Sequence, residues 1–537
     1  MGIYLNPKEI RNLYRKEIQK PYFVDKTEFL AELIPLVEQE GSNLSITRPR
    51  RFGKSVTAAM IASFFCKGVD SSDIFSNLKI AKDPGYAKHL NRHNVIYINF
   101  SKAPKDCSSY REYIDYFREG LADDIKEAYP EARHRQGDTI GAMLCNVLRK
   151  YDDEMFIFVF DEWDYIFHRS YFTEEDRGRF TAFLGDLTKD QPYITMTYMT
   201  GILPIKKYSA SDTMNHFAEN NMANDPMYGR YFGFTNAEVD DLYARYVKKT
   251  VSPRVSRDEL TAWYDGYLND DGLSLYNPNS VVTALTKNRV GSHWSKAGEY
   301  EELKDYVVND TDGVRDAVML LAAGEPVETD VSEYATTAPK LERLDQILSV
   351  MTVYGYLNYH DGCVRIPNKE LELEFDKIIR EEPRYSYMKQ LEKESNRVLK
   401  ATLDLDTDTI ADVLAFVHNS ESPLKAYSDE AELSGSVKLA WIAARNRYDM
   451  QREDQAGIGY VDYIFYPYNR KDDGIIIELK VDDSPETALK QIRQKQYALK
   501  FQGKLGEPPK TSGRILLVGI GYYKKDKVHR CKIEVAK

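Results

Sequence analysis

Short apolar segments alternate with longer amphipathic ones through the first 200 residues. Strand-length segments start near Leu44 and cover 94–100, 155–160 and 193–201, while 28–37, 55–65, 108–128, 138–151 and 174–189 show helical spacing. Strands that alternate with helices predict a parallel sheet covered by helices. The chain therefore opens with a predicted α/β domain.

The turn after the first predicted strand carries phosphate-binding chemistry. It reads Arg48-Pro-Arg-Arg-Phe-Gly-Lys-Ser55 and leads into the predicted helix. Glycine lets the backbone approach a phosphate, Lys54 would reach the outer phosphates of ATP, and the Ser55 hydroxyl would hold Mg²⁺ at a helix N-terminus. These residues predict the second half of a nucleotide-binding loop.

The first half of this loop departs from the common motif. Arg48 stands where glycine is usual, and Pro49 lacks an amide donor. Arg50 and Arg51 could supply positive charge instead. The predicted nucleotide-binding residues of the loop are Arg48, Arg50, Arg51, Phe52, Gly53, Lys54, Ser55 and Val56.

The apolar segment Met155-Phe-Ile-Phe-Val-Phe160 ends in two carboxylates. A buried parallel strand that ends in this way predicts a nucleotide site in which Asp161 faces Mg²⁺ and Glu162 activates water. The alternative is a core strand followed by a helix cap. Thr200, after the next strand, is either a sensor of the γ-phosphate or an ordinary strand-end threonine. The strand at 94–100, between loop and carboxylates, is typical of ATPases with a catalytic glutamate.

Composition narrows the class of protein. The 537 residues predict about three domains, and a net charge of −11 argues against a general nucleic-acid coat. Residues 501–537 are basic, which suits a local phosphate contact or a solvated face. The five cysteines form no paired motif, and neither a signal segment nor an apolar run of membrane-spanning length is present. We therefore expect a cytoplasmic protein without a membrane segment.

A second candidate site lies near the C-terminus. Tyr460-Val-Asp-Tyr-Ile-Phe-Tyr466 and Gly474-Ile-Ile-Ile-Glu-Leu-Lys-Val481 predict neighbouring strands. Side chains alternate along a strand, so Glu478 and Lys480 share a face that Asp462 can join. Two carboxylates with a lysine suit metal-dependent phosphodiester cleavage. The alternative is a surface hairpin with a salt-bridged Glu-Lys pair.

Several motifs of the first 300 residues resemble the predicted AAA-ATPase-like proteins of bacteria. They are Tyr22-Phe-Val-Asp-Lys-Thr27, the loop 48–55, Phe160-Asp-Glu-Trp-Asp164, Tyr231-Phe-Gly-Phe-Thr235, Trp263-Tyr-Asp-Gly-Tyr267 and Tyr276-Asn-Pro278. In that family the arginine-rich loop is the usual form. The resemblance implies ATP and Mg²⁺ as ligands, with Ser55 and Asp161 holding the metal.

Residues 420–500 resemble the PD-(D/E)xK nuclease superfamily. The resemblance implies that Asp462 and Glu478 hold Mg²⁺ or Mn²⁺, that Lys480 completes the motif, and that Gln491 supports the site. Glu430 matches the acid of the first helix. The residues after it depart from the family pattern, so Glu432 is an alternative.

These patterns predict a P-loop NTPase with further units. We expect an AAA-like ATPase domain at 1–234, a helical lid at 235–335, a small winged-helix-like unit at 336–400 and an α/β nuclease-like domain at 401–537. The preferred function is ATP-dependent or ATP-regulated cleavage of DNA, in defence against foreign DNA. A nucleotide-gated scaffold that binds without cutting and an ATPase that remodels a protein partner are the alternatives. The oligomeric state is left open, a homo-oligomer being one option.

Overall fold

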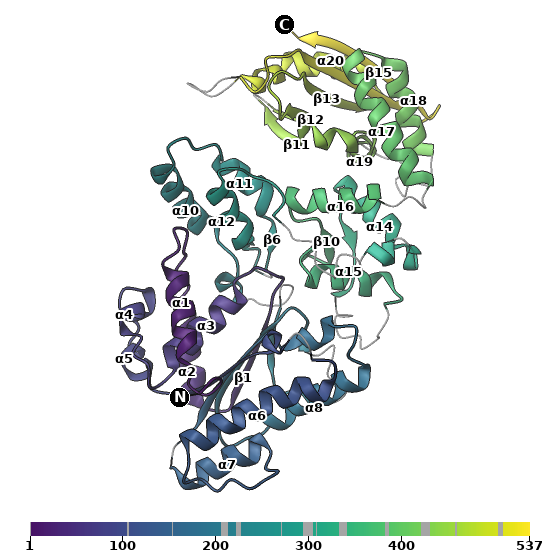
Figure 1. Ribbon diagram of the computed structural model, residues 1–537. Coiled ribbons are helices and arrows are strands. Elements are labelled where there is room, and N and C mark those ends of the chain that lie inside the picture. Colours follow the sequence, from purple (N-terminus) through teal and green to yellow (C-terminus); the bar gives the residue numbers. More distant parts are fainter. Residues whose placement is uncertain are drawn as a thin grey trace. The chain divides into compact units, whose positions relative to one another are not determined.

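The computed structural model describes residues 2–104, 107–152, 154–205, 213–221, 227–269, 271–293, 304–307, 309–331, 341–381, 386–419, 430–456, 459–502 and 509–536. The chain forms two compact units (Figure 1). Unit 1 comprises Met1–Leu303 and Glu328–Leu371, and unit 2 comprises Lys304–Val327 and Glu372–Lys537. The expected boundaries at 234, 335 and 400 do not coincide with this division and stay predictions.

Unit 1 is built on a parallel sheet in the order β2-β3-β4-β1-β5. Its strands are β1 (Ser42–Thr47), β2 (Asn94–Asn99), β3 (Phe156–Asp161), β4 (Ile194–Gly201) and β5 (Ala218–Asn220). Because β4 lies between β1 and β3, the phosphate loop and the Asp-Glu pair end non-adjacent strands. The parallel sheet predicted from the apolar segments is confirmed.

Helices cover both faces of this sheet (Figure 1). The longer ones are α1 (Lys8–Ile18), α2 (Glu28–Gln39), α3 (Lys54–Phe65), α6 (Tyr110–Ala128), α7 (Ile140–Lys150) and α8 (Glu174–Thr188); short ones are α4 (Ser72–Phe75), η1 (Lys79–Lys82), α5 (Tyr86–His89), η2 (Phe100–Lys102), η3 (Trp163–His168) and η4 (Gly229–Tyr231). In β3, Ile157 and Val159 join the core formed with α2 and α3, whereas Phe160 packs against Phe100 on the opposite face. Burial on both faces explains why the segment is continuously apolar.

The rest of unit 1 is mostly helical, as expected. It contains α10 (Asn236–Lys249), α11 (Arg257–Tyr264), β6 (Tyr267–Leu268), β7 (Ser274–Leu275), α12 (Pro278–Lys287), α15 (Leu344–Val353), β9 (Asn358–His360) and β10 (Cys363–Arg365). Capping boxes at Thr235 and Ser256 begin α10 and α11. Asp361 and Gly362 both have positive φ and form the two-residue turn of the hairpin β9–β10.

Unit 2 contains a mixed sheet in the order β11-β12-β13-β14-β15. Its elements are η5 (Thr311–Gly313), α14 (Val314–Ala323), α17 (Ser386–Asp404), α18 (Thr407–Asn419), α19 (Glu430–Ala440), η7 (Ile442–Asn446), β11 (Tyr448–Ala456), β12 (Gly459–Pro467), β13 (Gly474–Val481), α20 (Pro485–Gln494), η8 (Tyr497–Phe501), β14 (Ile515–Tyr523) and β15 (Val528–Ala536). β8 (Val327–Glu328) and α16 (Lys369–Glu381) lie where the chain passes from one unit to the other.

Close packing positions α20 over the parallel pair β13–β14. A Cβ at Gly519 would lie 2.3 Å from the Pro485 carbonyl oxygen, so glycine is needed for the helix to approach the sheet. Buried ion pairs, among them Arg445 with Asp376 at 2.6 Å, attach α16 to the rest of this unit. The helix that carries Gln491, α20, is thus packed closely on β13 and β14.

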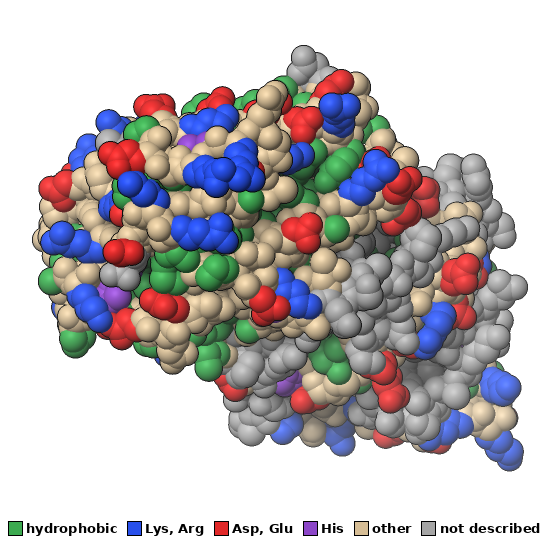
Figure 2. All heavy atoms as spheres, turned by 90° about the horizontal axis from the view of Figure 1, so that it is seen from below, with side chains coloured by type: hydrophobic (Ala, Val, Ile, Leu, Met, Phe, Trp, Pro, Cys, Tyr) green, Lys and Arg blue, Asp and Glu red, His purple; other side chains and the backbone are tan. Residues whose placement is uncertain are grey.

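The surface is mixed in charge. Basic and acidic side chains are interspersed over the face shown in Figure 2, and several form exposed pairs one helical turn apart, such as Lys126 with Asp123 in α6. Such pairs contribute little to stability. Within the described residues, no helix is long and apolar enough to cross a membrane.

Candidate nucleotide and nuclease sites

The phosphate loop closes around Lys54, the first residue of α3. The Lys54 Nζ donates to the carbonyl oxygens of Arg48 at 2.7 Å and Pro49 at 2.8 Å, so the loop curves over the lysine. Gly53 has a φ of 90°, a conformation that favours glycine. A Cβ there would meet no atom of the described residues within 4 Å, which leaves space above the loop for a phosphate.

The ends of three parallel strands supply the polar groups beside the loop. Register places Asn99 beside Asp161, and Asp161 beside Thr200. The Asp161 Oδ1 lies 3.2 Å from the Ser55 hydroxyl, and its Oδ2 accepts from the Asn99 amide at 2.7 Å. Asn99 was not predicted as a site residue, although its place at the end of the strand next to Asp161 is visible in the sequence.

Burial shifts the protonation of the two charged groups at the loop. Asp161 is fully buried, and burial together with the neighbouring Glu162 raises its pKa to about 6. Lys54 is 8% exposed, and burial lowers its pKa to about 8. Buried charges require compensation. A phosphate chain over Lys54 and a Mg²⁺ ion at Ser55 and Asp161 would supply it, so these residues fit Mg²⁺ and ATP.

The arginines of the loop lie in different environments. Arg48 is 2% exposed; its Nη1 donates to the carbonyl oxygens of Thr47 and Asn220, and its guanidinium lies 5.4 Å from the centre of the Phe232 ring. The Arg51 Nη1 donates to the His293 carbonyl oxygen at 2.6 Å. The Arg48 side chain is thus buried against Thr47, Asn220 and Phe232, and the nucleotide contact that we predicted for it stays a prediction.

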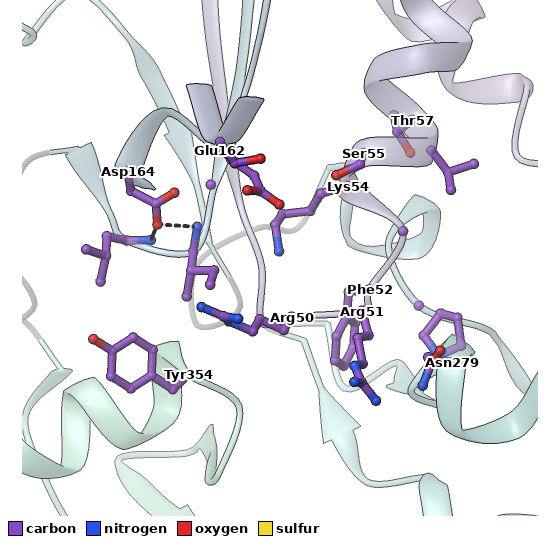
Figure 3. Close-up of a pocket in the computed structure, with 18 of the residues that line it drawn as sticks. Arg50, Arg51, Phe52, Lys54, Ser55, Thr57, Glu162, Asp164, Asn279 and Tyr354 are labelled. Carbon is purple, nitrogen blue, oxygen red and sulfur yellow. Dashed lines mark hydrogen bonds between the residues drawn. The ribbon is translucent and has the colours of Figure 1, made fainter. Parts of the chain in front are cut away.

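A cavity of about 1260 Å³ lies over the loop. Arg50, Arg51, Phe52, Gly53, Lys54, Ser55 and Val56 line it, together with Tyr22, Phe23, Val24, Phe234, Pro278 and Asn279. Figure 3 shows Lys54, Ser55 and Glu162 on one side of this space and Tyr354 on the other. The volume exceeds the roughly 300–1000 Å³ of most ligand sites, so it accommodates a nucleotide.

The carboxylates after Asp161 have separate roles. Glu162 lines the cavity with a positive φ of 51°. Asp164 is buried and accepts the amides of Ile202 at 2.8 Å and Leu203 at 2.9 Å. Burial alone would raise the pKa of Asp164, but hydrogen bonds from His168 and these amides hold it below its usual value. Asp164 positions the segment after β4, a role that the sequence motif did not specify.

Thr200 is the last residue but one of β4 and pairs with Asp161 of β3. Its hydroxyl is buried and donates to the Ile46 carbonyl oxygen at 2.9 Å. That bond joins β4 to β1 and is the contact expected of an ordinary strand-end threonine. Neither Thr200 nor Asp161 lines the cavity directly, and the sensor role stays a prediction.

In unit 2, Asp462 of β12 and Glu478 of β13 meet at one place on the sheet. Register pairs Tyr463 with Ile477, and the Asp462 Oδ2 accepts the amide of Leu479 at 2.7 Å. The Lys480 Nζ lies 3.5 Å from the Glu478 Oε1. The three side chains that we expected to converge therefore do so.

Gln491 and Tyr497 complete the surroundings of Glu478. Gln491 of α20 donates its amide to the Glu478 Oε1, and it also hydrogen-bonds to the buried Tyr497 of η8. Gln491 thus lies where we predicted a supporting residue. The hydrogen bond from Tyr497 orients the Gln491 side chain. The Tyr497 hydroxyl is a further polar group near the carboxylates of Asp462 and Glu478.

The electrostatics of this site fit a divalent metal. Glu478 is 2% exposed, and burial and the charge of Asp462 raise its pKa to about 8. Its Oε2 is buried and has no hydrogen-bond partner among the described residues. A buried carboxylate oxygen without a partner is costly, and oxygen ligands are those that Mg²⁺ and Mn²⁺ prefer.

The acid predicted for the first helix is Glu430 or Glu432. Glu430 is the first residue of α19, but the side chains of Glu430 and Glu432 lie outside what the structure describes. The described residues alone contain no cluster of three or more His, Cys, Asp or Glu suited to a metal. Among the described residues, Asp462 and Glu478 are the carboxylates brought together here, and the choice between Glu430 and Glu432 stays a prediction.

Comparison with known families agrees with both sites. Residues 10–211 match the family described as predicted AAA-ATPase, and residues 430–529 match the PD-(D/E)XK nuclease superfamily. The chain thus joins an AAA-ATPase-like domain of P-loop fold to a C-terminal nuclease-superfamily domain, as the sequence motifs predict.

Individual relatives are distant. An uncharacterized protein in the vnfD 5′ region of Azotobacter chroococcum is 24% identical over 286 residues, which are 52% of this chain and 51% of that protein. The chain thus spans about half the length of the curated relative it matches. A Walker-type ATPase of Pyrococcus abyssi is 13% identical, covering 65% of this chain and 95% of that one with a TM-score of 0.35. A STAND protein of Pyrococcus horikoshii with a tetratricopeptide repeat sensor is 10% identical, covering 72% and 50% with a TM-score of 0.23.

Proposed function

We propose that the protein binds and hydrolyses ATP and uses its nucleotide state to regulate a Mg²⁺-dependent DNA nuclease. The observation that carries the proposal is the convergence of Asp462, Glu478 and Lys480, with a buried, unpartnered Glu478 oxygen among the described residues. It is supported by the phosphate loop of unit 1, in which Lys54 is buried beneath space for a phosphate. We place this activity in the cytoplasm, in defence against foreign DNA.

At the ATPase site each residue has a defined task. Lys54, held by two loop carbonyls, binds the outer phosphates, while Ser55 and Asp161 hold Mg²⁺. The ion, when bound, neutralises charge on the phosphates. Glu162 faces the cavity and accepts a proton from the attacking water. Asn99 keeps Asp161 oriented toward Ser55.

At the nuclease site Asp462 and Glu478 hold the metal. A divalent ion bound there supplies a Lewis acid for the scissile phosphate. Lys480 positions the attacking water and offsets the negative charge that develops on the phosphate. Gln491 holds the Glu478 carboxylate in place through its amide. DNA held through its phosphates would be cut with little sequence preference, in a salt-dependent manner.

Cleavage of supercoiled and linear DNA with titrated Mg²⁺ or Mn²⁺ and ATP tests the nuclease. Asp462→Ala and Glu478→Ala should lose metal binding and cleavage together. Lys480→Ala should keep the metal and cut about 10²–10⁴-fold more slowly. Ca²⁺ should support DNA binding without cleavage. Lys126→Ala, which removes an exposed lysine of α6, is the matched control.

The same assay distinguishes the proposed nuclease from a nucleotide-gated scaffold that binds without cutting. A wild-type protein that leaves every DNA and RNA substrate whole, or a Lys480→Ala variant that cuts as fast as wild type, would favour a nucleotide-gated scaffold. The feature that favours this second function is Pro49, which removes one amide donor from the phosphate loop.

A further inference from the structure

Two sequence motifs of unit 1 have no part in the chemistry described so far. The first is Tyr22-Phe-Val-Asp-Lys-Thr27 and the second is Tyr231-Phe-Gly-Phe-Thr235. The structure places both beside the nucleotide cavity, which is lined by Tyr22, Phe23, Val24 and Lys26 of the first motif and by Tyr231, Gly233 and Phe234 of the second. Segments that lie about 200 residues apart in sequence thus share one wall.

The catalytic groups proposed above fix the direction in which a nucleotide lies in this cavity. The terminal phosphate has to lie near both Lys54 and Glu162, so the base points away from Glu162. Figure 3 shows Asp164 and Asn279 on opposite sides of Lys54. On the Asn279 side the cavity is lined by apolar groups, namely Phe23, Val24, Phe234, Pro278 and Val282. Flat apolar faces of this kind suit a nucleobase.

Lys26 joins the two motifs. Its Nζ donates to the Arg230 carbonyl oxygen at 2.6 Å and to the Glu238 Oε2 at 2.7 Å. These acceptors lie just before and just after the second motif. The Glu238 oxygen is itself fixed, because it also accepts the Thr235 amide in the capping box of α10. Lys26 therefore holds the second motif at both of its ends.

Helix α10 holds the first motif in return. The Arg245 Nη1 donates to the Phe23 carbonyl oxygen at 3.0 Å, and Tyr22 hydrogen-bonds to Thr250 at the end of the helix. Because Lys26 contacts the first turn of α10 and Tyr22 contacts its end, the first motif runs antiparallel along this helix. Cations on both partners thus clamp the motif to α10.

We infer that Lys26 and Arg245 are positioning residues for the base of the bound nucleotide. They clamp the first motif to α10 and so keep Phe23, Val24 and Phe234 together as the apolar surface on which the base packs. The inference rests on the proposed ATP binding and names the residues that determine how the base is held. The phosphates are held separately by the loop, so the clamp contributes only to the base-dependent part of the affinity.

Calorimetric binding of ATP and of inorganic tripolyphosphate, which has the phosphates but no base, tests this assignment on the full chain. Lys26→Met should weaken ATP affinity by about 10–100-fold, on the scale of the charged hydrogen bonds lost, and leave tripolyphosphate affinity within about threefold of wild type. The KM for ATP should rise with kcat within about threefold of wild type, because base binding is equal in the ground and transition states. Lys26→Arg should retain most of the ATP affinity because it keeps the charge and the donors.

Arg245→Gln changes a side chain that is 33% exposed, and it decides the question if Lys26→Met does not fold. It should show the same pattern with a smaller loss of ATP affinity. Lys79→Met is the matched control, because Lys79 forms an exposed pair with Glu28 and does not line the cavity. It should bind both ligands as wild type does.

The outcomes separate this inference from the ATP-binding proposal. Clamp variants that bind ATP as tightly as wild type overturn the inference alone, and so do variants that lose ATP and tripolyphosphate affinity equally. Wild-type protein that binds ATP no more tightly than tripolyphosphate also overturns it, because the base would then contribute nothing. Wild-type protein that binds neither ligand overturns both the inference and the ATP-binding proposal.

Discussion

Lys54 is a buried cation whose amino group donates to two neutral carbonyl oxygens. Removing a charge from water is costly unless an opposite charge replaces the lost hydration. The nearby carboxylates of Asp161, Glu162 and Asp164 offset part of this cost, and bound phosphate would offset more of it. The contribution of Lys54 should therefore be large for ATP affinity and small for folding.

The first prediction concerns the two functions of this site. Lys54→Ala should abolish ATP binding, because the phosphates lose their buried positive charge. Glu162→Gln should bind ATP as wild type does and hydrolyse it slowly, because the base is lost while Ser55 and Asp161 remain. Calorimetry gives the affinities, and phosphate release gives the rates. Undiminished ATP binding by Lys54→Ala would show that the site is misassigned.

The second prediction concerns Glu478 in metal-free protein. Its pKa rises from an ordinary value of 4.5 to about 8 on folding, so the folded state binds more protons than the unfolded state between these values. The free energy of unfolding should therefore fall as pH rises from about 4.5 to about 8, and level off above. Metal binding displaces this proton and should tighten over the same range.

Denaturant unfolding in EDTA across this pH range measures the effect. Glu478→Gln, which cannot ionise, should lack that part of the pH dependence. Metal affinity measured at pH 6.5 and pH 8 should rise in wild type. A metal affinity that is flat with pH would mean that Glu478 already carries its charge in the folded protein.

At the scale of elements, the phosphate loop is joined to the hairpin β6–β7. Phe52 is 1% exposed, and its ring packs edge-on against Tyr267 with centroids 5.0 Å apart. The Tyr267 hydroxyl donates to the Gly355 carbonyl oxygen at 3.0 Å, and the Leu268 amide donates to Asn358. A movement of the loop would therefore reach the segments before and within β9.

The third prediction tests this connection. Nucleotide binding should slow amide exchange in β6 and β9 of wild-type protein, because the loop and its packing partners become ordered together. Phe52→Ala should bind nucleotide with that distant protection lost, whereas Tyr267→Phe keeps the ring and should retain most of it. Hydrogen–deuterium exchange with and without a slowly hydrolysed ATP analogue gives the comparison. Equal protection in wild type and Phe52→Ala would contradict the connection.

At the scale of the whole molecule, the two chemistries lie in separate compact units. A nucleotide can shift a second site only through different affinities for two arrangements of the protein. The chain crosses between the two units at both ends of residues 304–327 and within α16. These segments are therefore the covalent connections between the nucleotide site and the nuclease site. Regulation would require that nucleotide binding in unit 1 alters the state of unit 2.

The fourth prediction is that DNA cleavage depends on nucleotide state. Wild-type rates should differ between ATP, ADP and no nucleotide, and Lys54→Ala should cut at the nucleotide-free rate under all three conditions. Cleavage of linear DNA at fixed Mg²⁺ measures this. Equal rates under all conditions in wild type would leave a nuclease without ATP control.

The sequence by itself determined much of the architecture. Continuous apolar strands such as 155–160 predict a buried parallel sheet, because only strands covered on both faces tolerate that pattern. The chemistry of Lys54, Asp161, Glu478 and Lys480 was visible because short motifs combine residue types with a local backbone shape. Local patterns of this kind can be recognised in the sequence without knowledge of distant contacts.

Tertiary structure alone decided which contacts the polar side chains make and how their pKa values shift. Asn99 contacts Asp161, and Thr200 contacts Ile46, because strand order places them there; Glu478 has a raised pKa because distant residues bury it.

The loop arginines show this dependence on distant residues most clearly. In sequence Arg48, Arg50 and Arg51 are equivalent charges on one turn. Their directions depend on carbonyl groups far along the chain, at Asn220 and His293, and on the cavity left between them. A side chain's environment is set by residues that folding brings to it, and no local pattern contains that information.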